Sequence, residues 1–200
     1  QNLTIPLSSG TYHFSYVYKD GKWVLQQKDG QDVRPSVPET PKTEPKQEPT
    51  KPQQPTTPPA KESDSSKIET AGLTADEQKM LDLINAERKK AGLSPLAIDM
   101  RLVKISRLKS KDMIDNNYFS HTSPTYGSPF DALKANGITY RYAGENLAGA
   151  ATVEKAHTNL MNSPGHRANI LNPNFNYVGI GIVDGGPYGK MFTQTFIGTK

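Results

Sequence analysis

Two histidines and one carboxylate stand out among the side chains of this sequence that can do chemistry. His121, Glu145 and His166 each lie in a short polar stretch rich in turn-forming residues, and long segments separate the three. Imidazole and carboxylate groups ligate borderline metal ions and transfer protons near neutral pH. Their spacing is too wide for one face of a helix, so the fold has to bring them together. The sequence therefore predicts a polar site assembled from distant segments.

Several chemical roles are open to these residues. Two neutral imidazoles that converge in a cleft can take two positions of a tetrahedral zinc site and leave water in the others. Glu145 can orient one imidazole, ligate the metal itself, or act as a general base toward bound water. The alternative is purely structural, with Glu145 and His166 as buried polar residues that join a loop to a sheet.

A serine also lies close in sequence to the second histidine. A nucleophilic serine needs a base within hydrogen-bond reach and an oxyanion hole, and the sequence has no Gly-x-Ser-x-Gly motif. We therefore interpret Ser163-Pro164-Gly165 as a turn that ends a helix. Ser163 is kept only as a polar candidate residue of the cleft.

Capping signals divide the C-terminal part of the chain into helices followed by strands. Thr74 with Glu77 predicts a capping box, and Gly92 predicts the end of the same helix. Gly179 and Gly181 lie in a strand pattern, where they permit close approach of another element. We expect helices over 75–92, 99–116, 130–135 and 152–161, and strands over 138–142, 177–183 and 190–197. Helices first and a hairpin last indicate an α+β domain with an antiparallel sheet.

The first part of the chain has a different organisation. Residues 34–66 are rich in proline and polar side chains, so we expect an extended, proline-rich linker. Residues 12–25 alternate aromatic and polar side chains around Asp20-Gly21, which predicts a β-hairpin. Because a lone hairpin is marginal in water, we expect residues 1–33 to need a partner, either upstream residues of a longer domain that ends here or the C-terminal domain. Residues 67–200 are then long enough to form a domain with its own core.

Composition excludes several classes of function. The chain has no cysteine, which rules out disulfides and thiolate metal sites. Its net charge of +4 is mild and its basic residues are scattered, which argues against nucleic-acid binding. No apolar stretch approaches the roughly 20 residues of a membrane-spanning helix. Association with an anionic cell-wall polymer stays open.

A set of motifs in residues 68–200 resembles a known family. The motifs are Leu83-Ile84-Asn85-x-x-Arg88, Phe119-Ser120-His121, Gly144-Glu145-Asn146, Met161-Asn162-Ser163-x-Gly165-His166-Arg167-x-Asn169-Ile170-Leu171-Asn172 and Val178-Gly179-Ile180-Gly181. Together they resemble a bacterial member of the CAP superfamily, the cysteine-rich secretory, antigen 5 and pathogenesis-related 1 proteins. The resemblance implies a three-layer α-β-α sandwich with an antiparallel central sheet and an open cleft, preceded here by the hairpin piece and the linker. It also implies an extracellular or cell-envelope location.

The resemblance further implies a cleft with two histidines and two acids that binds divalent cations such as Zn²⁺. His121 fits the first histidine, Glu145 the first acid and His166 the second histidine. The second acid usually precedes the second histidine, and Ser163 stands at that position here. The site then carries less negative charge, so we expect a lower metal affinity than in members with both acids.

Three classes of function fit these observations. We prefer a secreted or cell-envelope binding module that holds a divalent cation and an undetermined extracellular ligand (a glycan, a lipid or a peptide). The second class is a metal-assisted hydrolase of protein or wall polymer, with His121 and His166 as metal ligands and Glu145 as the base. The third is a structural interaction domain whose cleft is vestigial. The missing second acid weakens the hydrolase most, because water activation needs a firmly held metal and a poised base.

Overall fold

The computed structural model describes residues 72–199 in full and the backbone of residues 14–19 and 22–28. In the N-terminal part, β1 (Phe14–Lys19) and β2 (Lys22–Lys28) pair as an antiparallel hairpin, at the place where the sequence predicts one. The linker expected at 34–66 lies outside the described residues. No helix of the described part is both long enough and apolar enough to span a membrane.

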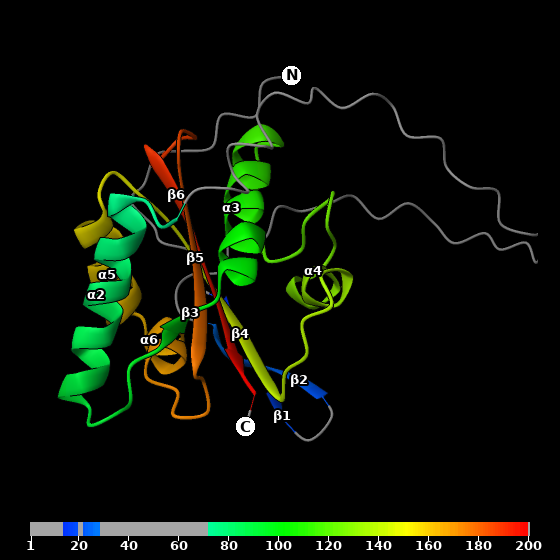
Figure 1. The fold of residues 1–200 in the computed structure, drawn as a ribbon. Coiled ribbons are helices and arrows are strands. Elements are labelled where there is room, and N and C mark those ends of the chain that lie inside the picture. Colours follow the sequence, from blue (N-terminus) through cyan, green and yellow to red (C-terminus); the bar gives the residue numbers. More distant parts are fainter. Residues whose placement is uncertain (1–13, 20–21, 29–71, 200) are drawn as a thin grey trace, which may run out of the picture.

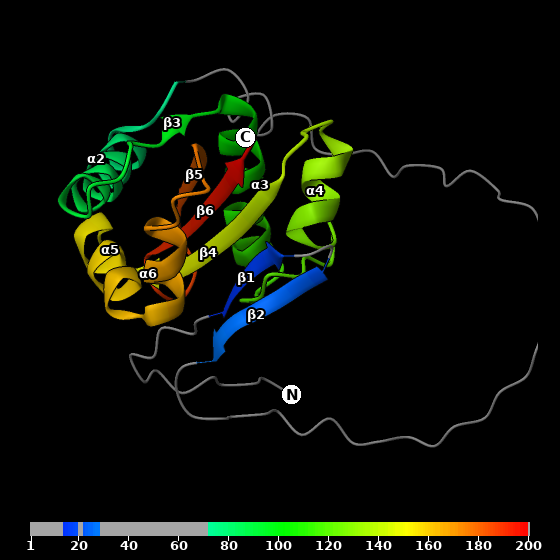
Figure 2. The ribbon, with the colours of Figure 1, turned by 90° about the horizontal axis from the view of Figure 1, so that it is seen from below.

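Helices cover both faces of a central sheet. The remaining elements are α2 (Ala75–Lys90), β3 (Ala97–Ile98), α3 (Met100–Asp115), α4 (Pro129–Ala135), β4 (Tyr142–Ala150), α5 (Val153–Asn162), α6 (Pro164–Ile170), β5 (Tyr177–Asp184) and β6 (Lys190–Gly198). The strand order is β3-β5-β6-β4, which leaves β4 at one edge. Helices α2, α5 and α6 lie on one face, and α3 and α4 on the other (Figure 1, Figure 2). The predicted α+β fold is confirmed.

Side-chain caps start the helices where the sequence predicts. Thr74 accepts a hydrogen bond from the Glu77 amide, and the Glu77 carboxylate accepts one from the Thr74 amide, which completes the capping box. Ser128 forms a second capping box at α4, and the side chains of Asp99 and Thr152 each accept a backbone N–H at the start of α3 and α5. Each cap satisfies backbone donors that have no partner inside the helix, and so fixes the residue at which the helix begins.

Two segments differ from the expectation. The strand expected at 138–142 is instead β4, so Glu145 lies within a strand and not in the loop after it. Pairing with β6 along the whole of β4 outweighs the weak strand propensity of Gly144 and Gly149. The turn expected at Ser163-Pro164-Gly165 instead begins α6, where Pro164 occupies a first-turn position that needs no N–H donor. The two-residue strand β3 also adds a parallel pairing to β5 in an otherwise antiparallel sheet.

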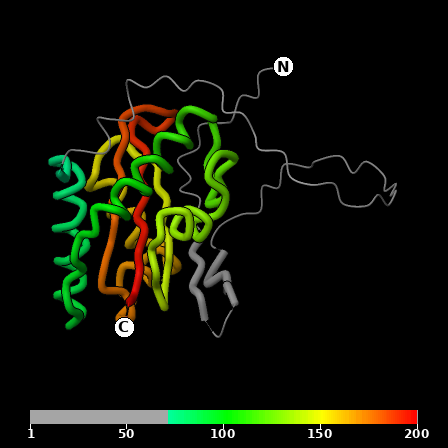
Figure 3. The backbone as a smooth tube through the Cα atoms, turned by 45° about the vertical axis from the view of Figure 1, so that its right-hand side comes forward, coloured from blue at the N-terminus to red at the C-terminus, as the bar shows by residue number. Residues whose placement is uncertain are grey.

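Helix α3 lies unusually close to the sheet, and glycines permit this. A Cβ atom on Gly179 would lie 2.2 Å from the backbone carbonyl carbon of Leu102. A Cβ atom on Gly181 would lie 2.1 Å from the backbone nitrogen of Arg107. Such distances are shorter than any real non-bonded contact, so only glycine fits at either position. The predicted role of these glycines in close approach is confirmed, and Figure 3 shows α3 running over the strands.

Hydroxyl pairs hold the same helix on the sheet. Ser106 Oγ lies 2.8 Å from Thr195 Oγ1, and one helical turn later Ser110 Oγ lies 2.8 Å from Thr193 Oγ1. Each serine also donates a hydrogen bond to a carbonyl oxygen of β5. All four side chains are buried, so the polar groups of this interface are paired without water.

Adding one methyl group at this interface tests the packing. We expect Gly181→Ala to lower the free energy of unfolding by about 1–3 kcal/mol or more, because the helix backbone has to move to admit the Cβ atom. Gly72→Ala is the matched control, since nothing lies within 4 Å of a Cβ atom there. Urea denaturation measures both. Equal stability of the two variants would contradict the close approach.

A buried histidine packs on the opposite face of the sheet. His157 of α5 is 7% exposed, and its Nδ1 atom is buried without a hydrogen-bond partner. Burial lowers the pKa of His157 below its ordinary value of 6.5, the negative charge of Glu87 opposes this shift, and the positive charge of Lys90 adds to it. His157 is therefore a neutral packing residue and lies outside the candidate site.

This lowered pKa makes stability depend on pH. Below the ordinary histidine pKa the unfolded chain takes up a proton that folded His157 does not, so stability falls as the pH drops from about 6.5 toward the lower folded-state pKa. We expect His157→Gln to lose this part of the decline. The measurement compares urea midpoints at about pH 7.5 and about pH 5.5 in both proteins. An identical decline in the variant would rule out His157 as its source.

Candidate functional site

Strand β4 presents polar side chains to both faces of the sheet. Glu145 lines a pocket on the side of α3 and α4, whereas the next residue, Asn146, bonds to α6 on the other side. This alternation follows from strand geometry, in which successive side chains point in opposite directions. Both side chains are buried, with 4% of Glu145 and none of Asn146 exposed. An edge strand therefore carries the polar centre of the domain.

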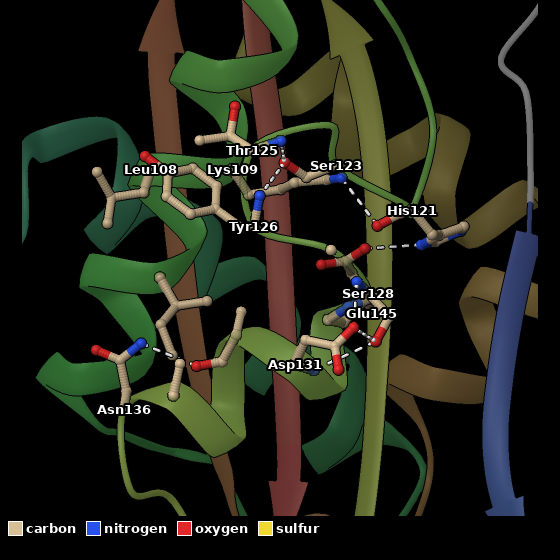
Figure 4. A pocket seen from close by; sticks show the side chains of 15 residues that line it. Leu108, Lys109, His121, Ser123, Thr125, Tyr126, Ser128, Asp131, Asn136 and Glu145 are labelled. Carbon is tan, nitrogen blue, oxygen red and sulfur yellow. Dashed lines mark hydrogen bonds and ion pairs between the residues drawn. The ribbon is translucent and has the colours of Figure 1, made fainter. Parts of the chain in front are cut away.

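His121 contacts Glu145 directly. The imidazole lies in the loop between α3 and α4, and its Nδ1 atom is 2.7 Å from Glu145 Oε1 (Figure 4). Both side chains are largely buried, at 11% and 5% exposed. Because an ionised carboxylate only accepts hydrogen bonds, Nδ1 is the donor, and the contact fixes the orientation of the ring. Nε2 is then the nitrogen with metal-ligand character.

A buried lysine holds the backbone at His121. Lys109 Nζ donates to the His121 carbonyl oxygen at 2.9 Å and lies 5.0 Å from the centre of the Tyr118 ring. Burial lowers the pKa of Lys109, and the negative charges of Glu145 and Asp112 offset part of this shift. The ammonium group thus adds positive charge beside the histidine–carboxylate pair.

Asp112 organises the rest of the same loop. Its carboxylate accepts hydrogen bonds from four side chains at 2.5–2.6 Å: Asn116, Tyr118, Ser123 and Thr125. Burial raises the pKa of Asp112, but these hydrogen bonds outweigh burial and leave the pKa below its ordinary value. One carboxylate on α3 therefore shapes the loop that carries His121.

His166 is positioned from the other face of the sheet. It lies on α6, is 1% exposed, and its Nδ1 atom is 2.9 Å from Ser163 Oγ. Ser163 is at once the C-cap of α5 and the N-cap of α6, so it is the single residue between the two helices. Ser163 therefore contacts the ring of the second histidine.

Side-chain amides tie α6 to β4. Asn146 Nδ2 donates to the His166 carbonyl oxygen at 3.2 Å and to Gln194 Oε1 at 3.0 Å. Asn169 Nδ2 donates to Asn146 Oδ1 at 2.9 Å and to the Glu145 carbonyl oxygen at 3.3 Å. The backbone of His166 is thereby fixed beside the strand residue that follows Glu145.

The loop after α6 has its own anchor. Arg88 of α2 is 1% exposed, and its guanidinium donates to the carbonyl oxygens of Ser94, Ile170, Asn172 and Phe175. A guanidinium presents its donors in a rigid, planar fork, so one side chain satisfies several buried carbonyls. This accounts for the arginine that closes the first sequence motif.

The two histidines thus reach β4 from opposite faces. His121 contacts Glu145 on the side of α3, and the His166 backbone is bonded to Asn146 on the side of α6. A ligand shared by both rings would have to lie at the outer edge of β4, where the two faces of the sheet meet. Among residues 72–199, no group of three or more His, Asp or Glu side chains is close enough together to hold a metal ion.

A pocket of about 330 Å³ opens beside the histidine–carboxylate pair. Its apolar wall comes from α3 and α4, for example Ile105, Leu108 and Ala132, and His121 and Glu145 lie among its polar lining residues (Figure 4). Its other polar residues bond mainly to the protein itself, since Ser123 and Thr125 bond to Asp112, Ser128 to Asp131 and Asn136 to a carbonyl oxygen of α4.

Comparison with known proteins places this arrangement in a family. The family model described as the cysteine-rich secretory protein family, CAP, matches residues 81–196, which include α3, β4, α6 and all four candidate residues. The chain belongs to the CAP family. The suspected resemblance is confirmed.

Two relatives of this CAP chain come from Bacillus subtilis. The uncharacterised protein YkwD of Bacillus subtilis is 51% identical over 140 residues, which cover 70% of this chain and 53% of the relative. The uncharacterised membrane protein YlbC of the same species is 39% identical over 129 residues, covering 62% and 35%. The chain thus spans about half of the first relative and about a third of the second.

Solved structures agree with the fold. An extracellular protein of Bacillus anthracis that contains an SCP domain superposes with a TM-score of 0.59 at 36% identity, over 72% of this chain and 45% of that one. A cysteine-rich secretory protein of Staphylococcus aureus gives a TM-score of 0.53 at 22% identity, over 62% and 38%, and supports the fold alone.

Sequence reasoning found some site residues of this CAP domain and missed others. It selected His121, Glu145, Ser163 and His166. The structure pairs His121 with Glu145, and Ser163 with His166. It gave no role to Glu154, and this exposed carboxylate pairs with Lys79 on the surface. It missed Lys109 and Asp112, which hold the His121 loop. Charged side chains are rarely buried without a partner, so the presence of Lys109 and Asp112 on the buried side of a predicted helix could have identified them.

Removing the Asp112 charge should loosen the His121 loop. We expect Asp112→Asn to cost about 1–3 kcal/mol of unfolding free energy, because donors in the loop lose an acceptor. The His121 imidazole resonances in NMR spectra should shift and broaden as well. Asp115→Asn is the matched control, since Asp115 is exposed and pairs with Lys111 on the same helix. Unchanged His121 resonances in Asp112→Asn would contradict this positioning role.

Proposed function

We propose that this CAP chain is an extracellular or cell-envelope binding module. Its cleft, built by His121, Glu145 and His166, holds a divalent cation, Zn²⁺ first among them, together with an extracellular ligand. The observation that carries the proposal is the 2.7 Å contact between His121 and Glu145 at the wall of a pocket. A histidine oriented by a carboxylate is the usual arrangement around a protein-bound metal.

The donor set fits a weakly bound cation. Nδ1 of each histidine contacts a protein oxygen, which is Glu145 Oε1 for His121 and Ser163 Oγ for His166, and we assign Nε2 of both rings as the coordinating atom. A bound zinc ion would supply a Lewis acid at the outer edge of β4. Ser163 brings no negative charge, and the nearby Lys109 ammonium opposes cation binding. Both features support a low affinity.

The pocket favours a ligand with a compact apolar group. Its volume of about 330 Å³ lies at the lower end of the range of small-molecule sites. Its polar lining residues already bond within the protein, so the hydroxyl groups of a sugar would find few free partners. The pocket therefore supports an apolar side chain or lipid group over a glycan.

Binding is better supported than hydrolysis. Glu145 is the candidate base, and its carboxylate is engaged with His121. A general base has to reach the water that it activates, which an engaged and buried carboxylate does less readily. The geometry thus supports an orienting role for Glu145. No contact in the described part of the chain specifically favours a hydrolase.

A described relative supports the proposed location. The Bacillus anthracis protein is described as extracellular, and the mild positive charge of this chain suits an anionic wall polymer. We propose cell-wall association on this basis. Fractionation of cells that produce the chain, with and without high salt, tests it, because wall attachment through charge is released by salt.

Zinc titration by calorimetry tests the cation site. We expect saturable one-site binding that is lost in the double variant His121→Ala/His166→Ala. Glu145→Gln should bind about 10–100-fold more weakly, because the ring loses its orienting carboxylate.

Glu154→Gln is the matched control for this titration, since Glu154 is an exposed carboxylate that pairs with Lys79 on the surface. Its affinity should equal that of the unaltered chain. Absence of zinc binding in the unaltered chain, or equal binding by the double variant, would overturn the cation site and leave the apolar pocket as the remaining ligand site.

A further inference from the structure

The outer edge of β4 is open to pairing. β4 forms a ladder with β6 along its whole length, and within the described chain its other edge has no ladder partner. An unpaired edge presents a row of backbone donors and acceptors, which is a template for another strand. β4 is nine residues long, which is long for an edge strand.

A strand of this same chain already lies beside that edge. β1 of the N-terminal hairpin packs against β4 and α6, and β2 packs against α6 (Figure 2). The hairpin is a separate two-stranded sheet, so no ladder joins it to β4. What the structure places beside the edge is therefore an extended strand that forms no ladder with β4.

The pocket adjoins the same strand. Glu145 belongs to β4 and also lines the pocket, and its neighbours on this face, Ala143 and Leu147, pack against α4 and α3. Tyr126 stands at the pocket with 40% of its surface exposed, one of few large apolar side chains in residues 72–199 left so open. An unpaired strand edge beside one apolar pocket is the arrangement by which proteins recognise extended peptides: the edge binds main chain and the pocket selects a side chain.

We infer that the cleft binds a segment of another polypeptide in extended conformation. Its main chain would lie along the outer edge of β4, and one large apolar side chain would fill the α3–α4 pocket. β1 of this chain occupies the edge in the absence of the partner and competes with it. The inference rests on the proposed binding function, for which it names the ligand class.

Competition from the tethered hairpin determines how the test is built. A tethered segment acts at an effective concentration in the millimolar range, so a free peptide binds poorly while the hairpin is intact. Val17→Pro removes a backbone donor from the middle of β1 and breaks the hairpin, and it leaves the separate four-stranded sheet unaltered. Thr43→Pro is the matched control, with the same substitution outside the hairpin.

The probe is a fluorescein-labelled synthetic peptide with the sequence of residues 12–28, titrated into the full chain and followed by fluorescence anisotropy. We expect the Val17→Pro chain to bind it at least about tenfold more tightly than the unaltered chain or Thr43→Pro. Hydrogen exchange at β4 amides should slow when the peptide is bound. Equal affinity for all three chains, or no binding by Val17→Pro, would overturn the inference.

Filling the pocket tests the side-chain contact. In the Val17→Pro background, Ala132→Phe should weaken peptide binding about tenfold or more, and Ala91→Phe, at the exposed end of α2, should leave it unchanged. Leu108→Ala provides a second pocket variant that adds no bulk. Binding that is insensitive to both pocket variants and leaves β4 exchange unchanged would sink the inference.

Zinc binding separates this inference from the proposed cation site. If the double variant His121→Ala/His166→Ala loses zinc and still binds the peptide with β4 protected, both proposals stand. If no variant binds zinc but the peptide still binds at β4, the cation site fails alone. If zinc binds and an octanoate probe, but not the peptide, occupies the pocket, the polypeptide inference fails and a lipid group takes its place.

Discussion

The arrangement depends on how closely α3 approaches the sheet. Gly179 and Gly181 leave no side chain between β5 and the helix backbone, so the helix rests directly on the strand. This contact determines how far Lys109 and Asp112 of α3 lie from the sheet, and these two residues hold the loop of His121. A helix lying one side-chain layer further out would carry the loop with it, and His121 could not reach Glu145. A packing constraint remote from the polar site therefore determines its geometry.

The edge strand joins the two halves of the domain. On one face β4 meets the loop held by α3, and on the other its Asn146 bonds to α6 and to Gln194 of β6. Buried amides are costly unless they are paired, so such contacts specify one arrangement of the elements more sharply than apolar packing does. The position of His166 relative to Glu145 is consequently a property of the fold and not of a flexible loop.

The sequence predicts most of the local structure, because local chemistry determines it. Thr74 and Asp99 cap their helices through neighbours in the chain, and the family motifs identify His121, Glu145 and His166. Prediction from the sequence fails where contacts between distant segments determine the local structure. β4 forms because β6 pairs with it along its whole length, although β4 contains two glycines. The helical conformation of Pro164 depends on the packing of α6. Lys109 and Asp112 escaped notice because their partners lie in a loop whose path is set by the tertiary structure.

Ser163 ends one helix and begins the next, and this junction has an evolutionary consequence. One residue inserted there would turn α6 by about 100° and advance it by about 1.5 Å. The His166 ring would leave Ser163, and its carbonyl would leave Asn146. Homologous chains that retain the cleft should therefore show constant length between α5 and α6, even where surface loops vary. A change of length at this junction would identify homologous chains that retain the fold and have lost the site.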